Sequence, residues 1–430
     1  MKLSTQPYKG TRDFYPEDKR VQKYLFGVWR QVCESFGYEE YDAPILEPTE
    51  LYLSKGNQEI IDEQTYTFED RGKRSVTMRT EMTPTVSRLV AGRRQELAYP
   101  LRWYSIPNLW RYERPQKGRL REHWQLNVDI FGVSGTSAEL ELIQIVDGIM
   151  GAFGASAEMY TIKLNSRKFM DYVLSDYAGF EAKQRLELAR LIDRLKKMPY
   201  DEFVAKVDAI ATPAQRKDGA VEKLLTVLSA KTLKDLPKDL QSYASINELK
   251  VLLSALDQLG VKNAEFDVTV MRGFDYYTDI VFEAFDNNPD NNRSMFGGGR
   301  YDGLISLFGV EPLPTVGFGM GDVTLTEFLR GHRLLPDLVS ETAAYLALVG
   351  DVHTGAQKLA AELRKAGMNV AVDLSGRKLG DQFKIAEKKG IQNVLIVGEN
   401  ELKTGQFTLK NLKTGKEQKL DVKGLEKALS

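Results

Sequence analysis

The sequence predicts an α+β domain that is interrupted by a helical insertion and followed by a separate α/β domain. Helix-like and strand-like segments are mixed from about residue 8 to 164. Strand signals nearly vanish from about 166 to 260 and return at 266–271 and 280–285, so the helical stretch interrupts a sheet. After residue 336 strands alternate with helices. A chain of 430 residues suffices for two or three domains.

The first mixed region predicts helices and short strands in a definite order. Pro16-Glu17-Asp18 favours a helix start, and Gly37 ends that helix after roughly Phe36. Pro44 favours an extended conformation. The remaining elements are an extended segment at 41–46, strands at 65–68 and 75–78, and a helix near 84–91.

A basic segment between two predicted strands is the most distinctive feature of this region. Four arginines and one lysine lie within residues 111–121, together with Pro115 and Gly118. Residues 101–106 and 126–130 have strand-like apolar patterns, which predicts a hairpin with a basic loop. Converging positive charges repel one another unless an anion lies among them, and guanidinium groups suit phosphoryl oxygens. The alternative is a solvated hairpin with a basic tip.

Composition limits the classes of function. A net charge of −1 means that any nucleic-acid surface is a local patch. The single cysteine, Cys33, excludes a disulfide within this chain, and its place on an amphipathic helix favours packing. The histidines, His123, His332 and His353, lack zinc-ligand spacing. The sequence shows no signal peptide or membrane-spanning run, so we expect a cytoplasmic protein without a membrane partner.

Two polar segments downstream are candidates for a ligand site. Residues 271–278 follow a predicted strand and contain an arginine, a carboxylate, two phenols and a hydroxyl. Each such group costs about 1–3 kcal/mol if it is buried without a partner, which favours a polar pocket over a core position. A solvated loop is the alternative. Residues 296–303 add a glycine-rich turn with Tyr301-Asp302, where a ligand or another strand can approach the backbone closely.

Two further segments have simpler structural interpretations. Residues 314–321 alternate glycine with apolar residues before a predicted helix at about 323–330. This pattern suits ligand approach or a strand that packs on its own helix. Glu81 lies just before the helix at 84–91, where a carboxylate favours the positive end of the helix dipole.

The last part of the chain predicts a small, mostly parallel α/β domain. Its elements are strands at 345–349, 369–374 and 393–397, with helices at 356–366 and 379–389. Residues 341–430 hold 15 Lys or Arg against 11 Asp or Glu, an excess of four. This excess permits RNA binding without requiring it.

Taken in order, these segments resemble the class II aminoacyl-tRNA synthetases, and specifically the histidyl-tRNA synthetases. The resemblance extends over nearly the whole chain. It rests on Gly10-Thr11-Arg12-Asp13-Phe14 with Pro16, on residues 66–71, on Pro44 in the first class motif, on residues 111–118 with Gln125 in the second motif, and on 272–278 and 298–303. The last two resemble elements peculiar to the histidine enzymes.

The resemblance implies domains, partners and cofactors. A catalytic core built on an antiparallel sheet would occupy 1–164 and 261–335, a helical insertion that contacts tRNA would occupy 165–260, and an anticodon-binding domain would occupy 341–430. The implied substrates are L-histidine, tRNA(His) and ATP with Mg²⁺. The implied assembly is a homodimer.

The resemblance also assigns residues to the ATP half of the site. Arg111 and Arg272 would neutralise the α-phosphate while the histidine carboxylate attacks it. Arg272 takes a role that other class members give to a metal, so no protein-bound metal is implied. Glu113 would accept a hydrogen bond from the adenine amino group, and Arg119 would hold the far end of the triphosphate.

Histidine would be recognised through each of its polar groups. The implied residues are Glu81 and Thr83 at the ammonium group, Gln125 at the carboxylate, and Asp129, Tyr277 and Tyr301 at the imidazole, with Tyr276 as a neighbour. A pocket that hydrogen-bonds a polar substrate group can reject analogues that lack it by roughly 10⁴-fold.

The chain departs from the family pattern at two positions. Asp129 stands where many bacterial relatives carry glutamate, which keeps the charge and shortens the side chain. Thr324 stands where the third class motif carries an arginine expected at adenine and the γ-phosphate. Arg330 lies about 240° farther round the helix at roughly 100° per residue, so it is a poor substitute. Arginines of the second motif are the candidates for compensation.

Two alternatives to a histidine–tRNA ligase follow from these features. Thr324 favours a non-catalytic paralogue with a regulatory or RNA-sensing role. The polar groups at Arg111, Glu113, Arg272, Tyr277 and Tyr301, together with the C-terminal domain, favour the ligase. A bare RNA-binding module is disfavoured by the near-neutral net charge.

Overall fold

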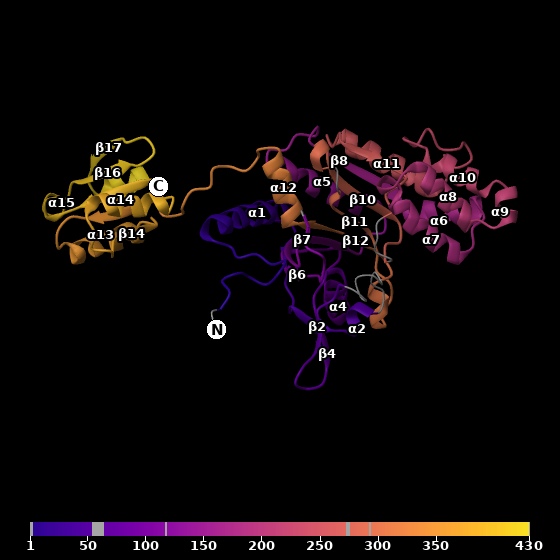
Figure 1. Cartoon of the computed structure of the whole chain (residues 1–430), viewed down its shortest axis with the longest axis horizontal. Helices are drawn as coiled ribbons and strands as arrows, with labels where there is room; N and C mark the ends of the chain where they lie inside the picture. The colour runs from indigo at the N-terminus through magenta and orange to yellow at the C-terminus, as the bar shows by residue number, and fades with distance from the viewer. Residues whose placement is uncertain (1–2, 54–63, 117, 272–275, 292–293, 430) are drawn as a thin grey trace. The chain divides into compact units, whose positions relative to one another are not determined.

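The computed structural model describes residues 3–53, 64–116, 118–271, 276–291 and 294–429 (Figure 1). The chain forms two compact units, with the boundary between Leu335 and Pro336. Each unit contains a main sheet of its own. Across the described ranges, no helix is long and apolar enough to span a bilayer.

A nine-stranded sheet forms the frame of the first unit. Most neighbouring strands in it pair antiparallel, and the described pairings are parallel only at its two ends. The spatial order is β1 (Glu39–Glu40), β5 (Leu101–Ser105), β7 (Glu122–Phe131), β12 (Thr315–Gly321), β11 (Ser294–Arg300), β10 (Ile280–Asp286), β8 (Tyr160–Ser166) and β9 (Ala264–Phe266), with β6 (Asn108–Trp110) beside β7. The predicted α+β core with an antiparallel sheet is confirmed.

Helices α5 (Ser137–Ala152) and α12 (Asp322–Gly331) pack on strands of this sheet, and α1 (Pro16–Ser35) packs on α5. The apolar residues Leu126 and Val128 of β7 join them in one buried cluster with Cys33 of α1. Burial raises the pKa of the Cys33 thiol to about 12, so this cysteine is a packing residue, as the sequence predicts.

A smaller sheet lies beside the main one in the first unit. It consists of β2 (Leu46–Pro48), β4 (Ser75–Met78) and β3 (Thr67–Glu69), with α2 (Glu50–Leu53) and α4 (Thr83–Arg93) nearby. The strand predicted at 75–78 is present with the same bounds, and the helix predicted near 84–91 is present as α4.

The stretch between β8 and β9 is helical. Its elements are α6 (Arg167–Tyr172), a π-helical turn (Val173–Tyr177), α7 (Ala182–Asp193), a 3₁₀ turn (Leu195–Lys197), α8 (Tyr200–Ile210), α9 (Pro213–Lys217), α10 (Ala220–Leu228) and α11 (Ala244–Gln258). Their buried apolar residues belong to the same cluster as the core of the sheet.

One strand is shorter than the sequence predicts. The run at 266–271 is a strand only up to Phe266, where β9 ends. Asp267 stops the strand because its carboxylate accepts hydrogen bonds from the backbone N–H of Thr269 at 3.0 Å and from the Thr269 hydroxyl at 2.6 Å. Val270 and Met271 therefore lie beyond the end of the strand.

The second unit has a mixed five-stranded sheet. Its order is β14 (Val370–Val372), β13 (Ala344–Leu348), β15 (Asn393–Val397), β16 (Phe407–Asn411) and β17 (Glu417–Leu420), with α13 (His353–Lys365), α14 (Leu379–Lys388), α15 (Glu399–Thr404) and α16 (Val422–Leu429). The first three strands are parallel, as predicted. The antiparallel β16 and β17 are absent from the prediction.

Candidate active site

A polar pocket lies over the centre of the nine-stranded sheet. It has an empty volume of about 380 Å³, and its walls come from α4 and the residues before it, from the hairpin of β6 and β7, and from β11 and β12. The lining residues are Glu81, Thr83, Arg111, Gln125, Asn127, Asp129, Tyr276, Tyr277, Gly297, Tyr301, Gly317, Phe318 and Gly319. The structure thus brings together eight of the site residues that the sequence predicts.

Strand β7 supplies the polar floor of this pocket by simple alternation. Gln125, Asn127 and Asp129 line the pocket, while Leu126 and Val128 between them are buried in the core. Asn127 is not among the residues predicted from the sequence. The same period-two pattern that predicts the strand could have identified it.

Glycines of β12 make room for two of these side chains. A methyl group on Gly317 would lie 2.0 Å from Oδ1 of Asp129, and one on Gly319 would lie 2.0 Å from Nε2 of Gln125. Such distances are impossible, so a side chain at either position would push Asp129 or Gln125 out of this arrangement. In segment 314–321 the polar side chains of β7 approach these glycines, and β12 also contacts α12, so both interpretations of this segment agree with the structure.

The carboxyl group of Asp129 is buried and pairs with a phenol. Asp129 is 4% exposed, and the hydroxyl of Tyr301 donates a hydrogen bond to its Oδ1 at 2.5 Å. Burial raises the pKa of Asp129 to about 7, and the hydrogen bond from Tyr301 opposes this rise. A ligand that donates an N–H to this carboxyl group would favour its ionised form.

A second buried carboxyl group lies in the same pocket. The hydroxyl of Tyr276 donates to Oε2 of Glu81 at 2.9 Å and lies 3.4 Å from Oγ1 of Thr83. Burial raises the pKa of Glu81, while the charge of Arg111 and the bond from Tyr276 lower it. Glu81 therefore does more than favour the dipole of α4, because its carboxyl group faces the pocket.

The aromatic wall is a cluster of three tyrosines. The ring centroids of Tyr276 and Tyr277 are 4.9 Å apart, and those of Tyr276 and Tyr301 are 5.8 Å apart. All three residues belong to one buried cluster with Val270 and Val281. The sequence prediction that the phenols of segment 271–278 line a pocket is consistent with these positions.

The basic residues of segment 111–121 do not all converge on one point. Arg111 lines the pocket, and its Nε donates to the carbonyl oxygen of Thr80 at 3.0 Å. The carboxylate of Glu113 lies 4.0 Å from Nη1 of Arg111 and 3.7 Å from Nη1 of Arg119. The Arg119 side chain is 61% exposed, which leaves it accessible to a ligand. Lys117 and Arg272 lie outside the described residues.

Thr324 lies in the first turn of α12, at the position where the family resemblance predicts an arginine of the third class motif. Its hydroxyl donates to the carbonyl oxygen of Met295 at 2.9 Å, and its methyl group would contact a Cβ on Gly118 at 3.8 Å. Arg330 lines a different hollow with Arg12 and Asp322. That Arg330 does not replace the missing arginine stays a prediction.

His123 continues the alternation of Gln125, Asn127 and Asp129 along β7. Burial lowers its pKa to about 3, and the positive charges of Arg111 and Arg12 lower it further. The imidazole is thus neutral at physiological pH. The spacing of the histidines excluded His123 as a zinc ligand, but its place beside the basic loop was not predicted from the sequence.

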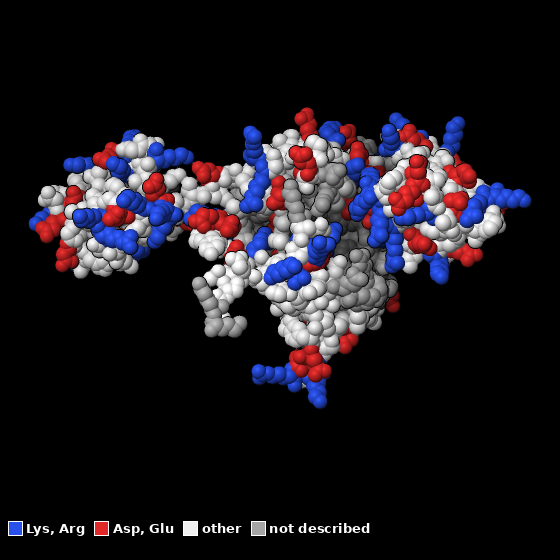
Figure 2. Space-filling model, viewed as in Figure 1, with Lys and Arg blue, Asp and Glu red and all other residues white. Residues whose placement is uncertain are grey.

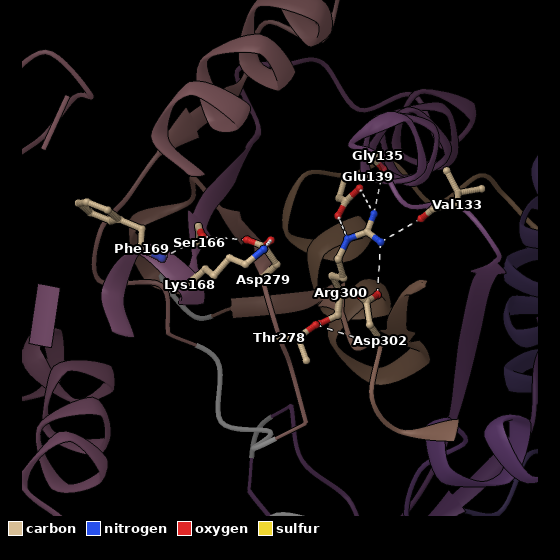
Figure 3. A network of polar contacts seen from close by, with 10 residues as sticks. All are labelled: Val133, Gly135, Glu139, Ser166, Lys168, Phe169, Thr278, Asp279, Arg300 and Asp302. Atoms are coloured by element: carbon tan, nitrogen blue, oxygen red, sulfur yellow. Dashed lines mark hydrogen bonds and ion pairs between the residues drawn. The ribbon is translucent and has the colours of Figure 1, made fainter. Parts of the chain in front are cut away.

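A buried ion pair anchors Arg300, the last residue of β11, directly before Tyr301. The guanidinium of Arg300 donates to both carboxylate oxygens of Glu139, at 2.7 and 2.8 Å, and to the carbonyl oxygens of Val133 and Gly135 (Figure 3). Glu139 is 0% exposed and Arg300 is 5% exposed. The carbonyl of Arg300 in turn accepts the backbone N–H of Thr278 at 2.7 Å. This pair fixes β11 beside the segment that carries Tyr277.

Comparison with known proteins gives consistent matches. The family model described as "Histidyl-tRNA synthetase" matches residues 10–323, and the one described as "Anticodon binding domain" matches residues 343–430. A "Histidine--tRNA ligase" from Leptospira biflexa is 45% identical over 415 residues, which cover 96% of this chain and 94% of that protein.

Two further comparisons extend these matches. The chloroplastic and mitochondrial "Histidine--tRNA ligase" of Arabidopsis thaliana is 38% identical over 429 residues, which cover 99% of this chain and 87% of that protein. The crystal structure of histidyl-tRNA synthetase from Nostoc sp. PCC 7120 aligns with a TM-score of 0.84 over 100% of this chain and 99% of that chain. At 22% identity, this last match shows a shared fold.

Proposed function

The chain belongs to the histidyl-tRNA synthetase family, and we propose that the polar pocket over β7 and β12 is where it activates histidine with ATP. In the first step, a carboxylate oxygen of histidine forms a bond to the α-phosphorus of ATP while the bond to pyrophosphate breaks. In the second step, a hydroxyl of the 3′-terminal ribose of tRNA(His) takes the histidyl group, and AMP leaves.

The observation that carries this proposal is the presence of two buried carboxyl groups, each paired with a phenol, in one pocket. Histidine carries two N–H-bearing groups, the ammonium and the imidazole, and each needs an acceptor. We assign Glu81 to the ammonium group and Asp129 to the imidazole. The supporting residues are Thr83 and Tyr276 beside Glu81, Tyr301 beside Asp129, Tyr277 of the same pocket wall at the imidazole, and Gln125 at the carboxylate of the substrate.

The ATP half of the reaction uses the basic hairpin. We assign Arg111 to the α-phosphate, since it lines the pocket beside Glu81 and Gln125. Glu113 would accept the adenine amino group, and the exposed Arg119 would close on the far phosphates. Arg272, which the family resemblance assigns to the α-phosphate, completes this set. Mg²⁺ would enter on the triphosphate, as it does in many phosphoryl-transfer sites.

The second unit is the expected contact with the anticodon of tRNA(His). Its match to an anticodon-binding family supports this assignment. Figure 2 shows Lys and Arg side chains gathered over the visible face of this unit, with Asp and Glu among them. We further propose that the helical insertion at 165–260 contacts tRNA, that the catalytic core at 1–164 and 261–335 forms a homodimer, and that the enzyme acts in the cytoplasm.

The alternative of a non-catalytic, regulatory paralogue is not favoured. The relatives named as ligases match nearly the whole chain, including the second unit. Thr324 remains the feature that distinguishes this site from the general class pattern, and Arg111 and Arg119 are the candidates that supply positive charge in its place.

The test is histidine-dependent exchange of pyrophosphate into ATP, measured with each of the common amino acids. We expect exchange with histidine alone. Arg272→Ala should lower the exchange rate by at least about 10²-fold, because it removes a cation from the developing charge. Arg93→Ala, on the exposed surface of α4, should keep the wild-type rate. Absence of exchange in folded protein that still binds histidine would support the regulatory paralogue.

A further inference from the structure

Arg121 differs from the other arginines of the basic hairpin in where its side chain lies. Arg111 lines the pocket and Arg119 is exposed, whereas Arg121 is 8% exposed and contacts residues of the N-terminal segment. The phosphate interpretation of segment 111–121 therefore does not apply to it. Its contacts indicate a structural role instead of phosphate binding.

The guanidinium of Arg121 is held at three points. Its Nε donates to the carbonyl oxygen of Glu113 at 3.1 Å, and its Nη1 donates to the hydroxyl of Tyr8 at 2.8 Å. The central carbon lies 4.0 Å from the centroid of the Tyr112 ring. A guanidinium in this position fixes both the backbone of Glu113 and the side chain before it.

The backbone around Arg121 is tied to the same segments. Its carbonyl accepts the N–H of Arg111 at 2.9 Å, and its own N–H donates to the carbonyl of Gly10 at 2.8 Å. Gly10 has a φ of +87°, and a Cβ there would lie 2.8 Å from Cγ of Arg121. Only glycine allows this close approach. The N-terminal segment is therefore shaped to fit against Arg121.

These contacts affect the site through Glu113, because its carboxylate lies near two other arginines. Its carbonyl is bound by Arg121, and its carboxylate lies 4.0 Å from Arg111 and 3.7 Å from Arg119. If the carbonyl were released, the carboxylate would shift relative to these cations. A displacement of about 1 Å in a binding group can lower activity by about 10²-fold.

We propose that Arg121 is a positioning residue for the nucleotide, which holds Glu113 where its carboxylate can accept the amino group of adenine. Tyr8 and Gly10 complete this support, so the N-terminal segment belongs to the nucleotide half of the site. The proposal rests on the function proposed above, because it takes ATP as the ligand of Glu113.

The test compares the full-length wild type with Arg121→Lys and Tyr8→Phe in pyrophosphate exchange. Arg121→Lys keeps the charge and loses the fork that reaches both Glu113 and Tyr8. We expect its KM for ATP to rise about 10–100-fold, as for the loss of a charged hydrogen bond, with the KM for histidine within about twofold of wild type. Tyr8→Phe removes one acceptor and should raise the KM for ATP by about 3–10-fold.

A second readout separates positioning from simple stability. Inosine triphosphate carries a carbonyl oxygen in place of the adenine amino group, so a correctly placed Glu113 disfavours it. We expect the preference for ATP over inosine triphosphate, as a ratio of kcat/KM, to fall in Arg121→Lys. Arg93→Lys, whose side chain is 71% exposed on α4, should leave every value unchanged.

The proposal is overturned if the KM values for ATP and histidine rise together, or if Arg121→Lys only lowers the melting temperature. Calorimetric titration of ATP into each variant measures the affinity for ATP without requiring activity. It therefore tests the role of Arg121 independently of the proposed function. If wild type binds ATP and shows no exchange with histidine, the proposed function fails. The ATP affinities of the variants still decide the role of Arg121.

Discussion

The buried carboxyl group of Asp129 lowers the stability of the ligand-free protein at neutral pH, and we assign the same group to the recognition of histidine. This carboxyl group lies against the glycines of β12 and receives a hydrogen bond from Tyr301, and burial raises its pKa from 3.8 to about 7. In the unfolded chain the same group ionises near its ordinary value. The folded state therefore holds a proton that the unfolded state releases between these two pH values.

We predict that Asp129→Asn stabilises the protein without ligand and weakens its binding of histidine. A carboxyl group with a raised pKa contributes stability that is complete below pH 3.8 and is lost as the pH rises to about 7. The gain in melting temperature of Asp129→Asn over wild type should therefore grow from pH 4 to pH 7 and stay level above it. Thermal unfolding at a series of pH values measures this difference.

Histidine provides the control for this prediction. It should raise the melting temperature of wild type and have little effect on Asp129→Asn, because an amide is a weaker acceptor for the imidazole N–H. A gain in melting temperature that is the same at pH 4 and pH 8 would contradict the raised pKa. Retention of wild-type histidine affinity would contradict the assignment of Asp129.

At the residue scale, the sequence identified most of the polar groups of the pocket and few of their partners. Residue chemistry alone favoured a pocket for the phenols at 276 and 277, and the family resemblance assigned Glu81 and Asp129 to it. The pairings of Glu81 with Tyr276 and of Asp129 with Tyr301 join residues that are 195 and 172 positions apart. No local pattern specifies such pairs.

At the scale of the elements, the pocket depends on the register between β7 and β12. Asp129 pairs with Gly317 and Gln125 pairs with Gly321, so the polar side chains of one strand face the glycines of the other. The sequence predicts both strands and the alternation of each. It does not specify their register, and a shift by one residue would place Val316 or Phe318 opposite Asp129, and Met320 or Asp322 opposite Gln125.

Helix α5 carries two glutamates that allow a matched comparison of ion pairs. Glu139 is 0% exposed and accepts two hydrogen bonds from Arg300, and Glu141 accepts two from Arg102 with side chains that are 23% and 32% exposed. We predict that Glu139→Ala lowers the free energy of unfolding by about 3–5 kcal/mol, because it leaves the Arg300 charge buried without its partner.

The control is Glu141→Ala, which should cost about 1–2 kcal/mol, because solvent screens its more exposed ion pair and the substitution also removes the acceptor of the buried Tyr38 hydroxyl. Denaturant unfolding of both variants measures the difference. Glu139→Ala should also weaken histidine binding, since Arg300 precedes Tyr301 and anchors the end of β11. Equal destabilisation by the two substitutions would contradict the role assigned to burial.

For the whole molecule, the order of its parts is more predictable than their details. Helices follow β8 from residue 167, and the new alternation after residue 336 begins at the boundary between the two compact units. The hairpin of β16 and β17 escaped prediction because β17, with the sequence Glu417–Leu420, is short, polar and largely exposed. Such a strand lacks the apolar alternation that identifies strands with one buried face.

The two units have separate hydrophobic cores, which leads to a prediction about their activities. The buried clusters of the second unit contain only residues from 344 to 425, and those of the first unit contain only residues up to 329. The candidate pocket lies entirely in the first unit. We predict that residues 1–335 alone fold and keep histidine-dependent pyrophosphate exchange within about tenfold of the full chain, because a unit with its own core can fold alone.

The same fragment should lose most of its ability to charge tRNA(His), because it lacks the unit that matches the anticodon-binding family. Loss of the contacts of a whole domain should lower kcat/KM for tRNA by at least about 10²-fold, which corresponds to about 3 kcal/mol of binding free energy. Exchange and aminoacylation assays on one preparation measure both activities. If the fragment unfolds cooperatively but lacks exchange activity, the second unit contributes to histidine activation. If the fragment charges tRNA as well as the full chain does, the first unit alone recognises the tRNA.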